Sequence, residues 1–214
     1  HCGLSSEIAL VLVHVVTDLS AWPWPHERSV ITIGAYDGVH LGHQAVIGQV
    51  RERAARVGAK SVVVTFDRHP ASVVRPDAAP RLLTNTAQKL ELLAATGVDA
   101  VVVLSFTPEQ SKEIPSDFVQ RVIVDGLHAS TVIVGSDFHF GHMRQGNVTL
   151  LREMGERHDF TCEPVVLIER ADDIDEPVSS TAIRRALAGG EITTAAKMLG
   201  HSYEVVGTVV TGDQ

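Results

Sequence analysis

Short runs of β-branched apolar residues alternate with amphipathic stretches along most of this chain. The expected strands are nearly continuous in Val and Ile and cover residues 30–33, 61–66, 100–104, 131–134 and 164–168. Runs without a polar face are typical of strands that are covered on both sides, as in parallel sheets. The stretches between them carry apolar residues at helical spacing over residues 41–57, 86–95 and 116–124. This order predicts an α/β fold with a parallel sheet flanked by helices and right-handed crossovers.

The pattern changes toward both ends of the chain. Residues 8–16 form an apolar run that is too short to span a bilayer and lacks the basic flank of a signal peptide, so we expect a first strand there. Two further helices are expected over residues 180–188 and 191–199, separated by Gly189 and Gly190. Residues 203–210 differ in character and predict an antiparallel or barrel strand. Because a single strand cannot fold alone, this strand is expected to belong to something larger or to pair at an edge.

The negative net charge of the chain argues against some classes of binding partner. The 214-residue chain has a formal net charge of -8, which makes it a poor general binder of nucleic acids or membrane surfaces. We therefore expect small-molecule partners, and the oligomeric state stays open. The two cysteines, Cys2 and Cys162, form neither a zinc pattern nor a disulfide framework, which favours a reducing, cytoplasmic location. If such an acidic protein binds a phosphate, its site must supply positive groups locally.

The segment from Gly34 to His43 carries the strongest chemical signal. It lies between an expected strand and an expected helix, and the alternative of a plain turn with surface histidines does not explain its density of glycines, histidines and aspartate. Glycines let the backbone approach a ligand closely, and a first helical turn offers unpaired N–H groups to an anion. His40 and His43 are three residues apart, so both imidazoles can face one anion, while Asp37 can orient the loop or act near a metal. The candidate ATP-binding residues here are Gly34, Ala35, Tyr36, Asp37, Gly38, His40, Gly42 and His43.

A cluster of hydroxyls followed by two arginines forms a second candidate site. Ser179 or Ser180 can cap the expected helix, and the remaining hydroxyls, with that of Thr181, can hold phosphate oxygens. Arg184 can clamp a phosphate bidentately. It lies four residues after Ser180 on the same helix face, whereas Arg185 is rotated away. Alone the segment would be an ordinary capped helix, but beside the first motif it favours a phosphate site.

Two further segments follow expected strands, where the ligands of parallel sheets bind. Residues 65–70 contain the candidates Phe66, Asp67, His69 and Pro70. Residues 134–141 contain the candidates Asp137, Phe138 and Phe140, and Asn147 lies downstream. The two phenylalanines could pack on a flat ring system or could equally belong to the core. Asp67 and His69 have a similar alternative, because either could cap a turn or a helix.

Taken together, the four segments resemble a known family. Residues 34–43 are similar to the HxGH motif of the nucleotidyltransferase superfamily, in the form found in bacterial FAD synthetases of the bifunctional riboflavin kinase/FMN adenylyltransferase family. Residues 178–185 resemble the family's Ser-Ser-Thr-x-Ile-Arg motif, and residues 66–70 and 135–141 resemble its flavin segments. The departures are Tyr36 for the commoner Phe, Arg68 for Pro, Ser136 for Glu and His139 for Arg. The resemblance implies a Rossmann-like nucleotidyltransferase domain over residues 13–200 and a fragment of a riboflavin kinase module over residues 201–214.

The resemblance also implies a reaction. It is the Mg²⁺-dependent transfer of AMP from ATP to FMN, which yields FAD and pyrophosphate without a covalent enzyme intermediate. It implies that His40 and His43 act at the α-phosphate and that Ser180, Thr181 and Arg184 hold the other phosphates; the metal ligands stay undetermined. Alternatives are another small-molecule nucleotidyltransferase, or a flavin- or nucleotide-binding module without turnover. Riboflavin kinase activity is not expected from the chain as it stands, since the rest of that module's barrel is absent.

Overall fold

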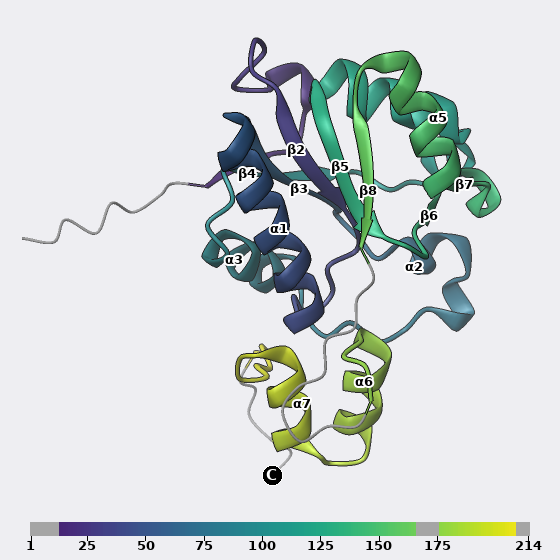
Figure 1. Ribbon diagram of the computed structural model, residues 1–214. Helices are drawn as coiled ribbons and strands as arrows, with labels where there is room; N and C mark the ends of the chain where they lie inside the picture. Colours follow the sequence, from purple (N-terminus) through teal and green to yellow (C-terminus); the bar gives the residue numbers. More distant parts are fainter. Residues whose placement is uncertain (1–12, 166–175, 209–214) are drawn as a thin grey trace, which may run out of the picture.

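The structure of this chain, a computed structural model, describes residues 13–165 and 176–208 (Figure 1). Its centre is a parallel sheet of six strands in the order β1-β4-β3-β2-β5-β8. The strands are β1 (His14–Val16), β2 (Ser29–Ile33), β3 (Lys60–Phe66), β4 (Ala100–Leu104), β5 (Ala129–Gly135) and β8 (Thr161–Val165). A short antiparallel pair, β6 (His139–Phe140) and β7 (Gly146–Asn147), follows β5. The predicted α/β class and parallel sheet are confirmed.

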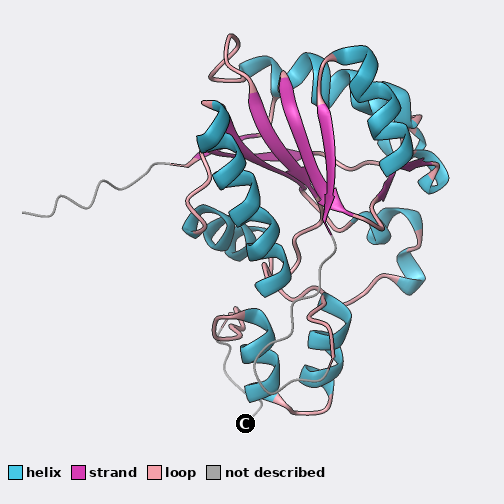
Figure 2. Ribbon diagram, viewed as in Figure 1, coloured by secondary structure: helices cyan, strands magenta, loops and turns pink. Residues whose placement is uncertain are grey.

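Helices cover both faces of this sheet (Figure 2). In Figure 1, α1 and α3 lie on one side of it and α5 lies on the other. The α-helices are α1 (Leu41–Val57), α2 (Pro70–Val74), α3 (Thr86–Ala95), α4 (Pro115–Phe118), α5 (Val148–His158), α6 (Ser180–Ala188) and α7 (Ile192–Leu199). A π-helical segment, η4 (Val119–Gly126), continues α4, and 3-10 turns occupy Leu19–Ala21, Pro76–Ala78, Gln110–Lys112 and His142–Arg144.

Successive strand residues pack into different layers, which explains why the strands lack a polar face. Ile31 of β2 packs with Phe118 in the largest apolar cluster, whereas its neighbour Val30 packs with Val50 of α1. In β3, Val63 belongs with Leu93 of α3 to a third cluster. Fully burying an aliphatic side chain of this size stabilises the folded state by roughly 1.5–3 kcal/mol.

Helices α6 and α7 form a separate layer beyond the carboxyl ends of the strands (Figure 1). Their apolar faces pack on each other and on Leu83 and Val178, through a small cluster centred on Ile183 and Met198. Leu41, the first residue of α1, packs against the same cluster. This arrangement holds the start of α6 against the start of α1, although about 140 residues separate them in the sequence.

Most predicted bounds agree with the structure, and the differences have physical reasons. The helices over residues 41–57, 86–95 and 180–188 have the predicted bounds. The helix expected over 116–124 starts at Pro115 and widens into the π-helical segment. The last sheet strand starts earlier than predicted, at Thr161, because it pairs there with Thr131; residues 166–168 of the prediction lie outside the described residues.

Two further expectations concern the ends. Of the first expected strand, over residues 8–16, only residues 13–16 are described, and they include β1. The barrel strand predicted over residues 203–210 is wrong for the described part, since residues 203–208 have no strand. Residues 209–210 lie outside the described part. Helix α5 was missed, although Asn147 caps it through a hydrogen bond from the Leu150 N–H.

Candidate active site

The loop between β2 and α1 has an unusual backbone. Three of its residues have positive φ, at 52° for Tyr36, 81° for Gly38 and 38° for Val39. A Cβ at Gly38 would lie 2.8 Å from the Leu83 side chain, so glycine is required there for both conformation and space. A β-branched residue with positive φ is strained, and such strain persists only where the surroundings hold it. We call residues 34–43 the phosphate loop, after the role that the sequence predicts for them.

His40 and His43 lie together at the start of α1. His40 is the N-cap residue, and its Nδ1 accepts a hydrogen bond of 3.3 Å from the His43 N–H. The two imidazole rings stack with centroids 3.6 Å apart and planes 16° apart. The Tyr36 ring lies 4.9 Å from that of His43. The predicted shared position is therefore a stacked pair rather than two side chains that separately point at one ligand.

Both histidines are neutral near pH 7. Burial lowers the pKa of His40 to about 4, although the Asp37 carboxylate acts in the opposite direction. Burial and the neighbouring His40 hold the pKa of His43 well below its usual range. A neutral imidazole carries one N–H donor and one acceptor nitrogen. Nδ1 of His43 is buried and has no hydrogen-bond partner among the described residues.

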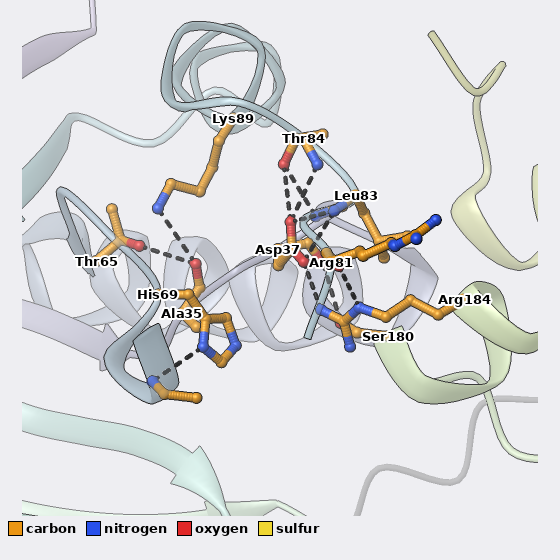
Figure 3. A network of polar contacts seen from close by, with 12 residues as sticks. Ala35, Asp37, Thr65, His69, Arg81, Leu83, Thr84, Lys89, Ser180 and Arg184 are labelled. Carbon is orange, nitrogen blue, oxygen red and sulfur yellow. Dashed lines mark hydrogen bonds and ion pairs between the residues drawn. The ribbon is translucent and has the colours of Figure 1, made fainter. Parts of the chain in front are cut away.

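Asp37 holds three segments together (Figure 3). Its carboxylate accepts hydrogen bonds from the backbone N–H of Leu83, at 2.9 and 3.0 Å, and of Thr84, at 3.1 Å. It also forms an ion pair of 2.5 Å with Arg184. Asp37 is only 4% exposed. Of its two predicted roles, the geometry therefore supports orienting the loop.

The start of α6 contacts the same loop. Ser179 caps the helix, since its side chain accepts from the Ala182 N–H, and this frees the Ser180 hydroxyl to donate to the Asp37 carbonyl oxygen at 3.0 Å. Arg184 donates through Nε to the Arg81 carbonyl oxygen at 2.7 Å. Arg185 points to Glu176 and forms an ion pair with it. The two arginines thus face different sides of α6, as their spacing predicts.

These segments enclose a cavity of about 360 Å³ at the carboxyl ends of the strands. It is lined by the phosphate loop, by the segment after β3 and by the start of α6. Eight predicted residues line it, namely Ala35, Tyr36, Asp37, His43, His69, Ser180, Thr181 and Arg184, whereas His40 does not. Sequence reasoning missed the other lining residues, which are Ala71, Arg75, Ala78 and Pro80. They belong to α2 and the turn after it, whose short, Pro-rich sequence carries no helical period.

His69 and Asp67 have structural partners in this region. His69 caps α2 by accepting from the Ala71 N–H at 3.1 Å, and burial lowers its pKa. Burial acts to raise the pKa of Asp67, but hydrogen bonds from Arg68 and the Phe106 N–H outweigh it and hold this pKa below its usual value. Phe66 ends β3 with its ring edge-on to Phe106. Pro70 is the first residue of α2.

The aromatic segment after β5 does not line this cavity. Phe140 is buried and packs against Phe118, and Phe138 stacks on Phe140 with ring centroids 5.5 Å apart. Asp137 is exposed, and the Asn147 side chain caps α5. None of the four candidates lines the 360 Å³ cavity. The core alternative, left open by the sequence, therefore describes the packing of Phe140.

Within residues 13–165 and 176–208, no three His, Cys, Asp or Glu side chains are grouped to hold a metal ion. No helix in the same ranges is long and apolar enough to cross a membrane. A second hollow, of about 690 Å³, lies at the amino ends of the strands and includes Arg28, Arg152 and Cys162 in its lining.

Comparisons with known proteins agree with this geometry. Residues 23–182 match the family model described as FAD synthetase. The chain is 38% identical over 189 residues to a bifunctional riboflavin kinase/FMN adenylyltransferase of Pseudomonas fluorescens, and 37% identical over 193 residues to one of Listeria monocytogenes. These matches cover 88% and 89% of the chain but 60% of each relative.

The fold also matches a solved structure. A crystal structure titled as a macrolide-efflux protein from Streptococcus pneumoniae superposes with a TM-score of 0.73 at 23% identity. That match covers 90% of this chain and 62% of the other, and it supports the fold alone. The family match spans most of the described residues and includes the phosphate loop, the segment after β3 and the start of α6. This chain therefore belongs to the FAD synthetase family.

Proposed function

We propose that this chain transfers AMP from ATP to FMN and so makes FAD and pyrophosphate. One observation carries the proposal: the phosphate loop, the segment after β3 and the start of α6 line a single cavity. Family membership and relatives named as FMN adenylyltransferases support this choice of substrates. Because the chain spans about 60% of the length of those relatives, their full activities are not carried over to it.

The stacked histidines suit charge stabilisation better than nucleophilic attack. In the proposed reaction an oxygen of the FMN phosphate attacks the α-phosphorus of ATP, and the bond to the pyrophosphate oxygen breaks in line. The N–H groups of neutral His40 and His43, with the unpaired N–H groups at the start of α1, would donate to the α-phosphate oxygens as charge grows there. Such donors cost no reorganisation if they are held in place beforehand, which the stacking provides.

Helix α6 would hold the leaving pyrophosphate. Its first turn presents Ser180 and Thr181 to the cavity, and Arg184 lines the same wall. Two N–H groups of Arg184 bond to Arg81 and Asp37, which fixes the guanidinium while leaving other N–H donors of its five for phosphate oxygens.

We propose that Mg²⁺ arrives as part of the substrate, bound to the triphosphate. There it would shield the phosphate charge from the incoming FMN phosphate. The described residues fit no protein-held ion at this point, since both Asp37 oxygens already accept hydrogen bonds and Arg184 pairs with one of them. The cytoplasmic location stays a prediction.

Incubation of the purified chain with ATP, FMN and MgCl₂, followed by chromatography, tests the proposal. We expect FAD and pyrophosphate in equal amounts, and no FAD when EDTA is present. CTP in place of ATP and nicotinamide mononucleotide in place of FMN test the choice of each substrate. A chain that binds FMN but forms no FAD would contradict the proposal.

A further inference from the structure

A buried lysine lies behind the candidate active site and belongs to none of the motifs above. Lys89 is on the core-facing side of α3, one turn before the fully buried Leu93, and is only 7% exposed. Burying an ammonium group is unfavourable unless polar partners compensate for the lost water. The partners of Lys89 should therefore show why the charge is there.

Among the described residues, its hydrogen-bond partners are two backbone carbonyl groups and no carboxylate. Figure 3 shows the one to Ala35. The Lys89 ammonium donates to the Phe66 carbonyl oxygen at 2.8 Å and to the Ala35 carbonyl oxygen at 3.4 Å. Phe66 is the last residue of β3, immediately before the segment that leads to His69. Ala35 is the second residue of the phosphate loop. The Lys89 side chain thus connects the carboxyl ends of the neighbouring strands β2 and β3.

A second side chain supports the same connection. The hydroxyl of Thr65, a fully buried residue of β3, donates to the Ala35 carbonyl oxygen at 3.1 Å. Within the part of the chain that the structure describes, no carboxylate is directly bonded to the Lys89 ammonium; burial lowers the pKa of Lys89, while Asp37 and Asp67 act in the opposite direction. These two carboxylates belong to the two segments that Lys89 connects.

We propose that Lys89 is a positioning residue that sets the spacing between the phosphate loop and the segment after β3. The proposal rests on the proposed function for its kinetic consequence, since these two segments would hold ATP and FMN respectively. In-line transfer depends on the distance between the attacking oxygen and the α-phosphorus, and small misplacements reduce turnover strongly. Each substrate would still find its own loop when Lys89 is absent. Removing the Lys89 ammonium should therefore lower kcat strongly and change the KM values for ATP and FMN little.

Lys89→Met removes the ammonium and keeps most of the aliphatic stem. We expect kcat for FAD formation to fall at least tenfold, while the KM values for ATP and FMN each change less than threefold. Lys112→Met is the matched control, because it removes the same charge from an exposed 3-10 turn. A lysine that only stabilised the fold would lower the thermal midpoint of Lys89→Met and leave kcat per folded molecule unchanged, which would overturn the proposal.

A second variant covers the case in which Lys89→Met does not fold. Lys89→Gln is neutral and one atom shorter, so it can hold one carbonyl but cannot span both. We expect its kcat to fall at least threefold with both KM values retained. Wild-type kcat in Lys89→Gln would overturn the proposal.

Hydrogen–deuterium exchange separates this proposal from the proposed function. In Lys89→Met, or in Lys89→Gln if the former does not fold, exchange should speed up in peptides covering residues 34–43 and 67–75. Exchange in β4 should stay as in the wild type. If the wild-type chain made no FAD, the proposed function would fail, yet faster exchange in both segments would still support the role of Lys89. Unchanged exchange in both segments would overturn it, whatever the turnover.

Discussion

Two hollows lie at opposite ends of the same sheet, and the smaller one is the better candidate site. The hollow at the amino ends of the strands is almost twice as large, about 690 Å³ against about 360 Å³. Its Arg28 is already bonded to the Ala129 carbonyl oxygen and to Asp159, which ties strand starts together. The smaller hollow is lined by His43, which stacks on the buried His40, and by the first turn of α6. Both hollows have polar linings, but only the smaller one contains a histidine of the stacked pair and the first turn of a helix, so its lining and not its size makes it the better candidate.

The largest expected effect tests the histidine pair. His43→Ala removes a donor held at the developing charge, so we expect turnover to fall on the order of 10²–10³-fold while FMN binding changes little. His26→Ala, in an exposed loop before β2, is the matched control. Steady-state rates and fluorescence titration of FMN measure the two quantities. Near-full turnover in His43→Ala would remove the main difference between the two hollows.

Acid should destabilise the protein because His40, beside the smaller hollow, is buried in its neutral form. The pKa of His40 is about 4 in the folded chain, below the 6.5 of an unfolded histidine, so the unfolded state takes up more protons as pH falls below 6.5. The stability contribution of neutral His40 is thus fully present above pH 6.5 and is lost toward pH 4, by roughly 2 kcal/mol at pH 5. Urea unfolding at pH 7 and pH 5 measures it, and His40→Gln should lose less stability over that interval. An equal loss in His40→Gln would assign the effect to other groups. The larger hollow should not contribute to this loss of stability. Burial raises the pKa of Cys162 to about 11, so this thiol does not titrate between pH 5 and pH 7.

Arg184 and Arg185 of α6 should differ in their effect on ATP use, although both effects are smaller than that of His43→Ala. Arg184→Lys should raise the KM for ATP on the order of tenfold, because an ammonium cannot bond to Asp37, Arg81 and a phosphate in the same planar arrangement. Arg185→Lys should have almost no effect, since its partner Glu176 lies away from the cavity. The ATP dependence of FAD formation decides between them. Equal effects would mean that the cavity wall is assigned to the wrong face of α6.

The smallest expected effect concerns the larger hollow. Arg152→Ala should leave kcat and both KM values within about twofold of the wild type, as expected for a surface residue remote from the reacting groups. A large loss of turnover in Arg152→Ala would show that the two ends of the sheet are coupled. The comparison between the hollows would then have to be withdrawn.

The sequence predicted the sheet and many of the residues that line the smaller hollow, for a clear reason, while their role toward a nucleotide stays a prediction. Continuous Val and Ile runs and helix periodicity are local signals, and Ser179 and Gly58 act as the caps that local rules predict. Lys89 was missed because one lysine in an amphipathic helix normally reaches solvent. Only the tertiary fold brings the Ala35 and Phe66 carbonyl groups to it.

The aromatic segment shows a different limit of sequence reasoning. A motif can identify Phe138 and Phe140, but Phe118, the ring partner of Phe140, comes from an element about 20 residues away. Whether a ring faces a ligand or the core depends on that packing. The roles of Asp137, Phe138, Phe140 and Asn147 toward a flavin therefore stay predictions.

The tyrosine of the phosphate loop has a consequence for how this protein can vary. Its buried hydroxyl lies 2.7 Å from the Thr32 hydroxyl in β2, and burial raises the pKa of Tyr36. Replacing either partner alone leaves a buried hydroxyl unsatisfied, at a cost of about 1–3 kcal/mol, whereas replacing both by apolar residues of similar shape is nearly neutral. We therefore expect positions 32 and 36 to vary together: Phe at position 36 would favour an apolar residue at position 32, whereas Tyr at position 36 would favour keeping a hydroxyl there.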